Sequence, residues 1–302
     1  MVDAEVLISQ KSVDQIELVT RTYRQRHAIL TLMRQLNRLI SAIQRHRGVS
    51  LAHLAGDGLF MDDVTQVQAQ VNQRLAVLKN SVDAFDALVS PHQQQNIQHG
   101  WNTVCHDWQG DALLENFEYH SFLIDQLLQL SGNFGRQLEP SLLAASNIEA
   151  NLSASEDDSV LRLVCRQVPE LIENLARIRG LATHAAVVHQ CDEDHQKKLL
   201  YWLQCAQRQN KELIAAVDAL EAGLKSGWRS LSELKNYELK LAFFLNTVSK
   251  DIVHGDCSQA DARQLFVLGS EIIDAYVEGV DGGISLLLSR LESELEGWLT
   301  SV

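Results

Sequence analysis

An eight-residue pattern that occurs twice constrains this chain more than any other feature of its sequence. Both copies read apolar, any, Arg, any, Arg, Gly, apolar, small, at residues 43–50 and again at residues 175–182. In each copy the second arginine, Arg47 or Arg179, continues a stripe of apolar residues spaced three and four positions apart. Such a stripe is one face of an α-helix. The chain is therefore expected to contain two comparable helices, each with an arginine on its packing face.

The repeated arginines predict a buried anion. A guanidinium on a packed face keeps its proton and needs a negatively charged partner. Gly48 and Gly180 follow the two arginines and would let two helices approach closely enough to share one anion. The other arginine of each copy, Arg45 or Arg177, lies about 200° further round its helix and is expected to face solvent.

The rest of the sequence predicts an all-α protein. Among 302 residues, 46 % are hydrophobic and only 3 are proline, which suits long helices. Helical periodicity indicates about eight helices and no convincing strand. Turn signals are expected to separate these helices at residues 56–58, 90–91, 110–111, 146–158, 191–194, 223–227 and 254–256.

Two linked four-helix bundles fit this pattern. The polar segment 146–158 is interpreted as the junction, so residues 1–145 would form the N-terminal half and residues 146–302 the C-terminal half of one domain. Pro169 is expected to kink the fifth helix or to mark its effective start. The fourth helix is expected to loosen at residues 132–135, and the glycines at 282–283 could interrupt or bend the last helix.

Composition and motifs exclude several classes of protein. The formal net charge of −13 and the absence of a basic stripe argue against direct nucleic-acid binding. Residues 1–11 do not form a signal peptide, and no apolar run is long enough to span a membrane. Five widely spaced cysteines without a CxxC pair are typical of reduced thiols, so a cytoplasmic location is expected.

Enzymatic and metal chemistry are not indicated. The sequence has no glycine-rich phosphate loop, nucleophile elbow or paired catalytic carboxylates, so we expect neither an enzyme nor a cofactor. His92, His99 and His106 are each two helical turns apart, about 10 Å, which is too far to share an ion. His189, Cys191 and His195 are interpreted as polar residues of a turn, and a phosphotransfer role for His195 is a remote alternative.

The two arginine motifs resemble those of the nitrate- and nitrite-sensing (NIT) domain family. Residues 44–50 are similar to the first family motif, Gln-Arg-Glu-Arg-Gly-small, with His46 in place of glutamate. Residues 168–181 resemble a second stretch, Leu-Pro-x-Leu followed by Leu-Gly-x-Leu-Arg-Gly, with Ala176 in place of its first glycine. Residues 117–128 also look like a family helix, so the likeness covers approximately residues 34–298.

The resemblance implies a helical sensor in which arginines hold nitrate or nitrite between helices. Arg47 and Arg179 match the motif positions, Ser50 could add a donor, and His46 could lie near the rim. A further arginine on a later helix belongs to the family's site; no arginine here matches it unambiguously, and Lys240 is the candidate by spacing. The alternatives for that position are Lys235 and Arg229.

The output would pass to a separate protein, because the chain ends at Val302 without room for an output module. The resulting hypothesis is a cytoplasmic nitrate/nitrite-sensing regulator, for which the long helices would allow a homodimer. The alternative is a helical interaction scaffold that binds no ligand and in which the two arginines form structural ion pairs. Glu173 and Glu149 are the candidate internal partners. The two hypotheses differ in whether the arginines are open to an anion or already paired with a carboxylate.

Overall fold

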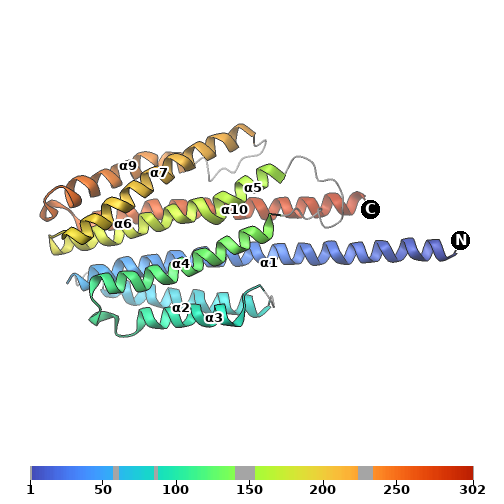
Figure 1. Cartoon of the computed structure of the whole chain (residues 1–302), viewed down its shortest axis with the longest axis horizontal. Helices are drawn as coiled ribbons and strands as arrows, with labels where there is room; N and C mark the ends of the chain where they lie inside the picture. Colours follow the sequence, from blue (N-terminus) through green and yellow to red (C-terminus); the bar gives the residue numbers. More distant parts are fainter. Residues whose placement is uncertain (1, 57–60, 85–87, 140–153, 224–233, 302) are drawn as a thin grey trace.

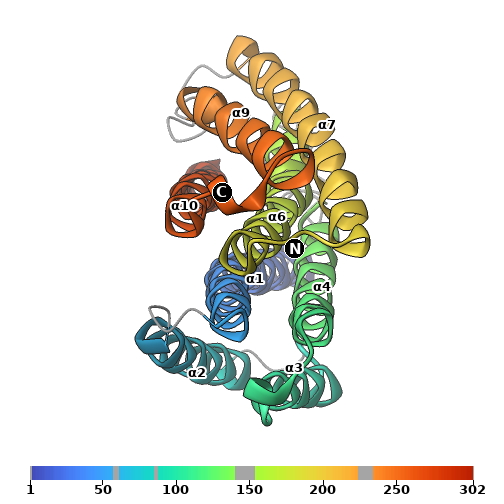
Figure 2. The same ribbon diagram turned by 90° about the vertical axis from the view of Figure 1, so that its left-hand side faces the viewer.

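The chain folds into an all-α structure in which two four-helix bundles lie side by side (Figures 1 and 2). The structure is a computed structural model that describes the backbone of residues 2–56, 61–84, 88–139, 154–223 and 234–301. No strand occurs in these ranges. The predicted boundary between the halves, at residues 145 and 146, lies outside the described residues, so the division into halves stays a prediction.

The N-terminal bundle contains four helices joined by short connections. Their bounds are α1 Val2–Leu54, α2 Met61–Ala84, α3 Pro91–Cys105 and α4 Leu113–Leu138. Local sequence explains the start of α3. The Ser90 side chain accepts a hydrogen bond from the Gln93 amide, the Gln93 side chain accepts one from the Ser90 amide, and Pro91 occupies the first turn.

The C-terminal bundle contains the remaining helices. They are α5 Ala154–Arg162, α6 Val168–Val188, α7 Glu193–Gly223, α9 Glu238–Thr247 and α10 Ala262–Ser301. A π-helical segment, Leu163–Gln167, joins α5 to α6 in one continuous rod, and a second, Val248–Val253, extends α9. Among the described residues the chain therefore forms eight rods, four in each bundle.

Pro169 explains the first π-helical segment. Its nitrogen carries no hydrogen, so it cannot continue the regular ladder of backbone hydrogen bonds. The amide of Val168 instead donates to the carbonyl of Leu163, five residues earlier. The expectation that Pro169 marks the effective start of a helix is confirmed, since α6 begins at Val168.

Two expected interruptions were wrong. α4 continues through Gly132 and Gly135, and α10 continues through 282–283. At Gly135 the glycine serves packing instead: a Cβ atom there would lie 2.9 Å from the Sγ atom of Cys165. Glycine inside a helix carries only a modest cost, which tertiary contacts can offset.

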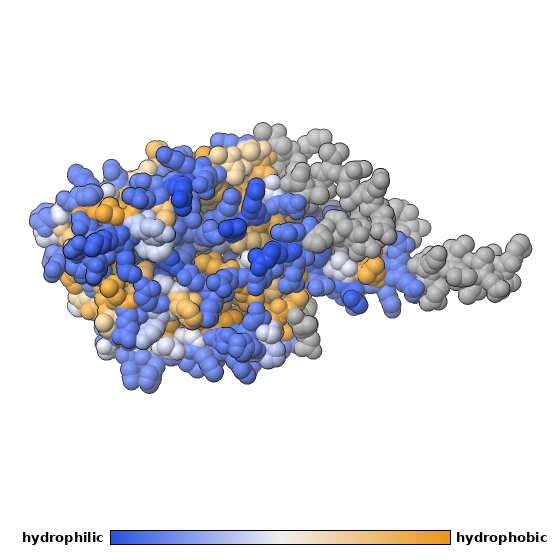
Figure 3. All heavy atoms as spheres, viewed as in Figure 1, coloured by the Kyte–Doolittle hydropathy of each residue, from blue (hydrophilic) through white to orange (hydrophobic). Residues whose placement is uncertain are grey.

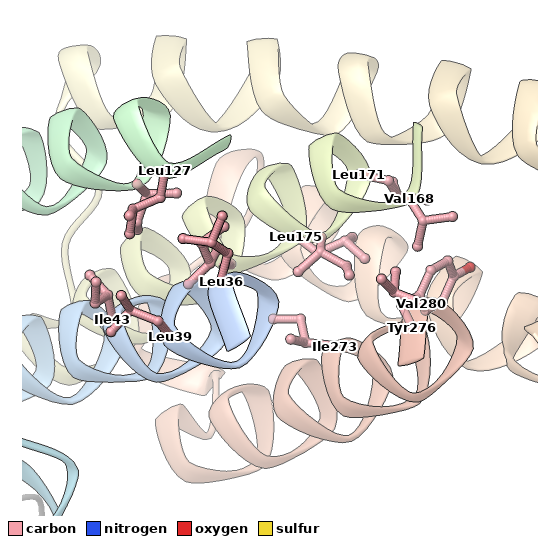
Figure 4. Close-up of a cluster of buried hydrophobic side chains, with 14 of the residues drawn as sticks. Leu36, Leu39, Ile43, Leu127, Val168, Leu171, Leu175, Ile273, Tyr276 and Val280 are labelled. Atoms are coloured by element: carbon pink, nitrogen blue, oxygen red, sulfur yellow. The ribbon is translucent and has the colours of Figure 1, made fainter. Parts of the chain in front are cut away.

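The core lies where α1, α4, α6 and α10 meet (Figure 4). Leu36, Leu39 and Ile43 reach it from α1, and Leu127 reaches it from α4. The labelled residues from α6 and α10 complete the cluster: Val168, Leu171, Leu175, Ile273, Tyr276 and Val280. α1 and α6 therefore belong to the centre of the molecule, and almost every residue of α6 from Val168 to Ala186 is buried.

The surface is mainly hydrophilic on the face shown in Figure 3, with hydrophobic residues in separate patches. The most exposed large apolar side chains are Leu239, Phe122, Phe243, Tyr201 and Leu299. Within the described residues, no helix combines the length and the hydropathy that crossing a membrane requires.

Candidate functional site

The two copies of the repeated motif pack against each other. One copy lies near the end of α1 and the other in α6, and these two helices are in contact. A Cβ atom on Gly180 would lie 3.1 Å from Leu51 and 4.0 Å from the Cα atom of Gly48. The glycines thus face each other and bring both arginines to one buried region.

Arg47 is fully buried and paired with Glu173 of α6. Its Nη1 atom lies 2.7 Å from Oε1 of Glu173 and its Nη2 atom lies 3.1 Å from Oε2, which is a bidentate ion pair. Nη1 also donates to the Ser121 hydroxyl, and the guanidinium lies over the Phe117 ring. Arg47 therefore already has an anionic partner inside the protein.

The Glu173 carboxylate accepts two further hydrogen bonds. The Nε atom of Arg177 donates at 2.5 Å, and the side-chain amide of Gln44 donates at 2.9 Å. Burial alone would raise the pKa of Glu173, but the charges of Arg47 and Arg177 outweigh it and the pKa is lowered. With four donors on two oxygens, this carboxylate is saturated.

The expectation that Arg177 faces solvent was wrong. Arg177 is buried, bonds Glu173 and Asp125, and lies over the Trp202 ring at 4.3 Å. Its position 200° from Arg179 would expose it on a helix with one packed face, but α6 is packed on nearly all sides. Arg45, on α1, is exposed as expected.

Arg179 lies in a slot between α1 and α10. A Cβ atom on Gly48 would lie 3.3 Å from Nη2 of Arg179, and one on Gly269 would lie 3.0 Å from its Cγ atom. The guanidinium lies over the ring of Phe266 at 4.8 Å. Neither glycine could carry a side chain without displacing Arg179, so the slot depends on both.

The partners of Arg179 are neutral. Nη1 donates to the Ser270 hydroxyl and Nη2 donates to the Gln44 carbonyl, both at 2.8 Å. The buried Nε atom has no hydrogen-bond partner among the described residues. Burial, followed by the charges of Arg47 and Arg45, lowers the pKa of Arg179 to about 9, so the side chain stays charged at neutral pH. Arg179 is a buried cation without a described carboxylate against it.

A small cavity adjoins Gln44 between α1, α6 and α10. Its volume is about 10 Å³ and it is lined by Asn37, Ile40, Gln44, Pro169, Ile172, Val277 and Val280. A cavity of this size holds at most a single water molecule. The side-chain nitrogen of Asn37 and the side-chain oxygen of Gln44 are buried and lack partners among the described residues. This cavity is therefore too small for a larger anion.

A histidine pair borders Arg47. His46 and His120 are both fully buried, and Nδ1 of His46 lies 2.8 Å from Nε2 of His120. Nδ1 of His120 lies 2.7 Å from the Asn116 carbonyl, so it donates there and its Nε2 atom accepts from His46. Burial lowers the pKa of His46 to about 4 and holds that of His120 well below its ordinary value. The pair is neutral at pH 7.

Of the other predicted site residues, Ser50 lies beside Arg47 and Lys240 lies at the surface. Ser50 is buried, but its hydroxyl is engaged with the Arg47 carbonyl and with Asn116. Lys240 is about half exposed on α9 and pairs with Glu271. It lies away from the buried face of α9, which carries apolar residues. The structure therefore does not bring Lys240 to the buried arginines. Lys235 pairs with Asp218, and Glu149 and Arg229 lie outside the described residues.

Sequence reasoning missed the groups that surround Arg179. Gln44 lies within the first motif copy, but its carbonyl role has no signature in a sequence. Phe266, Gly269 and Ser270 come from α10, and nothing in their spacing identifies α6 as their neighbour. Within the described residues, no three histidine, cysteine or acidic side chains are grouped to hold a metal ion.

Comparisons with known proteins identify a structural neighbour. No protein-family model and no curated protein matches the sequence. The fold is similar to the solved "Structure of the NasR transcription antiterminator", with a TM-score of 0.71 over 97 % of this chain and 76 % of that chain. The two sequences are 14 % identical over this alignment. The likeness shows a shared fold.

The packing at Gly48 predicts a strong effect of one methyl group. In Gly48→Ala the new Cβ atom would lie 2.9 Å from Phe266 and 3.3 Å from Arg179, so we expect a loss of about 1–3 kcal/mol in the free energy of unfolding. Gly132→Ala is the matched control, since Gly132 is also helical and nothing lies within 4 Å of its Cβ position. Urea denaturation of both variants would test this, and equal stability of the two would contradict it.

The buried His46 predicts acid sensitivity. Because its pKa is lower in the folded than in the unfolded protein, the unfolded state binds more protons between pH 4 and 6.5, and stability falls as pH falls through this window. At pH 4 the loss from His46 is roughly 3 kcal/mol. We expect His46→Gln to weaken the pH dependence measured by urea denaturation at pH 7 and pH 4.5. The control variant His99→Gln, at an exposed position, should leave the pH dependence of stability unchanged.

Proposed function

We propose that this chain is a regulatory protein that binds nitrate or nitrite at Arg179 and signals to a separate partner protein. One observation carries the proposal: Arg179 is a buried guanidinium whose partners are a hydroxyl and a carbonyl, and its Nε–H has no described partner. A buried cation with only neutral partners is costly, and an anion beside it removes that cost.

The chemistry of the slot suits a small planar oxoanion. A guanidinium presents N–H donors in one plane, and nitrate and nitrite present oxygen acceptors in one plane. The Phe266 ring covers one face of the guanidinium, and the Nε–H on its edge has no described partner, so the ligand would bind at that edge. The resemblance of both arginine motifs to those of the NIT family supports nitrate or nitrite as the ligand.

The two arginines have different roles in this proposal. Arg47 is held by Glu173, so the interpretation of a structural ion pair applies to it. Arg179 has no such partner, so the interpretation of a ligand-binding residue applies to it. The helical scaffold without a ligand stays the alternative function, and it requires Arg179 to be tolerated as a lone buried charge.

Binding would change how three helices pack. Arg179 is 2 % exposed and its guanidinium packs against Gln44, Phe266 and Ser270, so the ligand requires α1, α6 and α10 to move apart or their side chains to rearrange. A ligand that favours the opened packing shifts the population towards it. Such a shift between helices of both bundles could be transmitted to a partner.

The structural neighbour supports the regulatory part of the proposal. That protein is a transcription antiterminator, which is a kind of regulator. Its fold covers nearly the whole of this chain. The ligand, the partner and the cytoplasmic location rest on the sequence and on the chemistry of Arg179.

The proposal predicts a nitrate-dependent gain in thermal stability. A ligand that binds only the folded state adds about 2.7 kcal/mol at one hundred times its Kd. We expect nitrate to raise the Tm of the unmodified protein and of Arg45→Met, an exposed residue of the same motif, but not that of Arg179→Met. Methionine has a similar length and no charge, so Arg179→Met should be at least as stable as the unmodified protein without ligand.

Differential scanning fluorimetry at constant ionic strength is the measurement. A nitrate response that persists in Arg179→Met would show that the anion binds elsewhere. Strong destabilisation of Arg179→Met, together with no nitrate response of the unmodified protein, would favour the scaffold without a ligand.

A further inference from the structure

The buried charges around the proposed site leave one positive charge without a partner. Arg47 and Arg177 both bond Glu173, and Arg179 is linked to them through Gln44, whose side chain donates to Glu173 and whose carbonyl accepts from Arg179. Two carboxylates face them: Glu173 bonds Arg47 and Arg177, and Asp125 bonds Arg177. The unmatched charge is on Arg179, whose bonded partners are neutral.

Neighbouring groups do not alter this balance. Arg45 and Asp274 both act on Arg179, but they have opposite charges and both are exposed. His46 and His120, which lie next to Arg47, are neutral at pH 7 because burial opposes their protonation. A bound anion therefore meets a net charge of one.

We infer that Glu173 restricts the proposed nitrate site to monovalent anions. The inference rests on the proposed function and adds the residue that determines specificity. One negative charge beside Arg179 would bring the buried charges to balance. A divalent anion such as sulfate would leave an excess negative charge in a region from which water is excluded, and that is unfavourable.

Glu173 is better placed for this role than Asp125. Its side chain is 3 % exposed, and its four hydrogen bonds fix it between α1 and α6. Without it, Arg47 would lose its carboxylate partner and Arg177 would keep only Asp125. The side chain of Asp125 is 52 % exposed, so solvent screens its charge.

Removal of the Glu173 charge tests the inference. We expect the unmodified protein to be stabilised by nitrate and nitrite but not by sulfate at matched ionic strength. In Glu173→Gln the net buried charge rises by one, so the affinity for sulfate relative to nitrate should rise by about tenfold or more. The affinities come from thermal shifts over a concentration series of each sodium salt.

A double variant separates charge from shape. Arg47→Met combined with Glu173→Gln removes one charge of each sign, so it leaves the net charge as in the unmodified protein and should still exclude sulfate. If Glu173→Gln does not fold, Asp125→Asn adds the same charge from the surface. In Asp125→Asn the affinity for sulfate relative to nitrate should also rise, but by a smaller factor, because Asp125 is half exposed.

Failure of the inference and failure of the proposed function give different results. If the unmodified protein binds nitrate through Arg179 but binds sulfate equally well, or if Glu173→Gln and Asp125→Asn leave the preference unchanged, then Glu173 does not determine specificity and the nitrate site stands. If no anion stabilises the unmodified protein, the proposed function itself is wrong.

Discussion

The Glu173 carboxylate links the two central helices, α1 and α6, through buried hydrogen bonds. It accepts N–H groups from Arg47 and Gln44 of α1 and from Arg177 of its own helix, so it ties the two central helices to each other. Because each of its oxygens is already bonded twice, it has no capacity for the third buried guanidinium. Arg179 is left with neutral acceptors, and the proposed ligand binding rests on that difference between two arginines in equivalent motifs.

Most of the fold could be predicted from the sequence because helices leave local signals. Ser90, Gln93 and Pro91 specify the start of α3 through their own side chains, and Pro169 specifies the irregular turn before α6. The positions of glycines predicted the ends of helices less well. Gly135 permits close contact between α4 and Cys165 instead of ending a helix, and that role depends on a neighbour that is distant in sequence.

The candidate site could be predicted only in part. The repeated motif identified two buried arginines, since a side chain on an apolar stripe is expected to pack. The same argument was wrong for Arg177, because α6 is surrounded by neighbours and has no solvent face at that point. Ser270 and Phe266 could not be found at all, since only tertiary packing brings α10 beside Arg179. Thus the sequence identified the charges and, in Glu173, the partner of Arg47, but not the groups around Arg179.

The most direct test of this account is a pair of crystal structures, one grown with sodium nitrate and one without it. The account predicts planar electron density within hydrogen-bond distance of the Nε atom of Arg179, with α1, α6 and α10 rearranged around it and the Arg47–Glu173 ion pair intact. Saturating nitrate with no density at Arg179 would contradict the account. Density at Arg47 with Glu173 displaced would also contradict it, because the two arginines would then share a role.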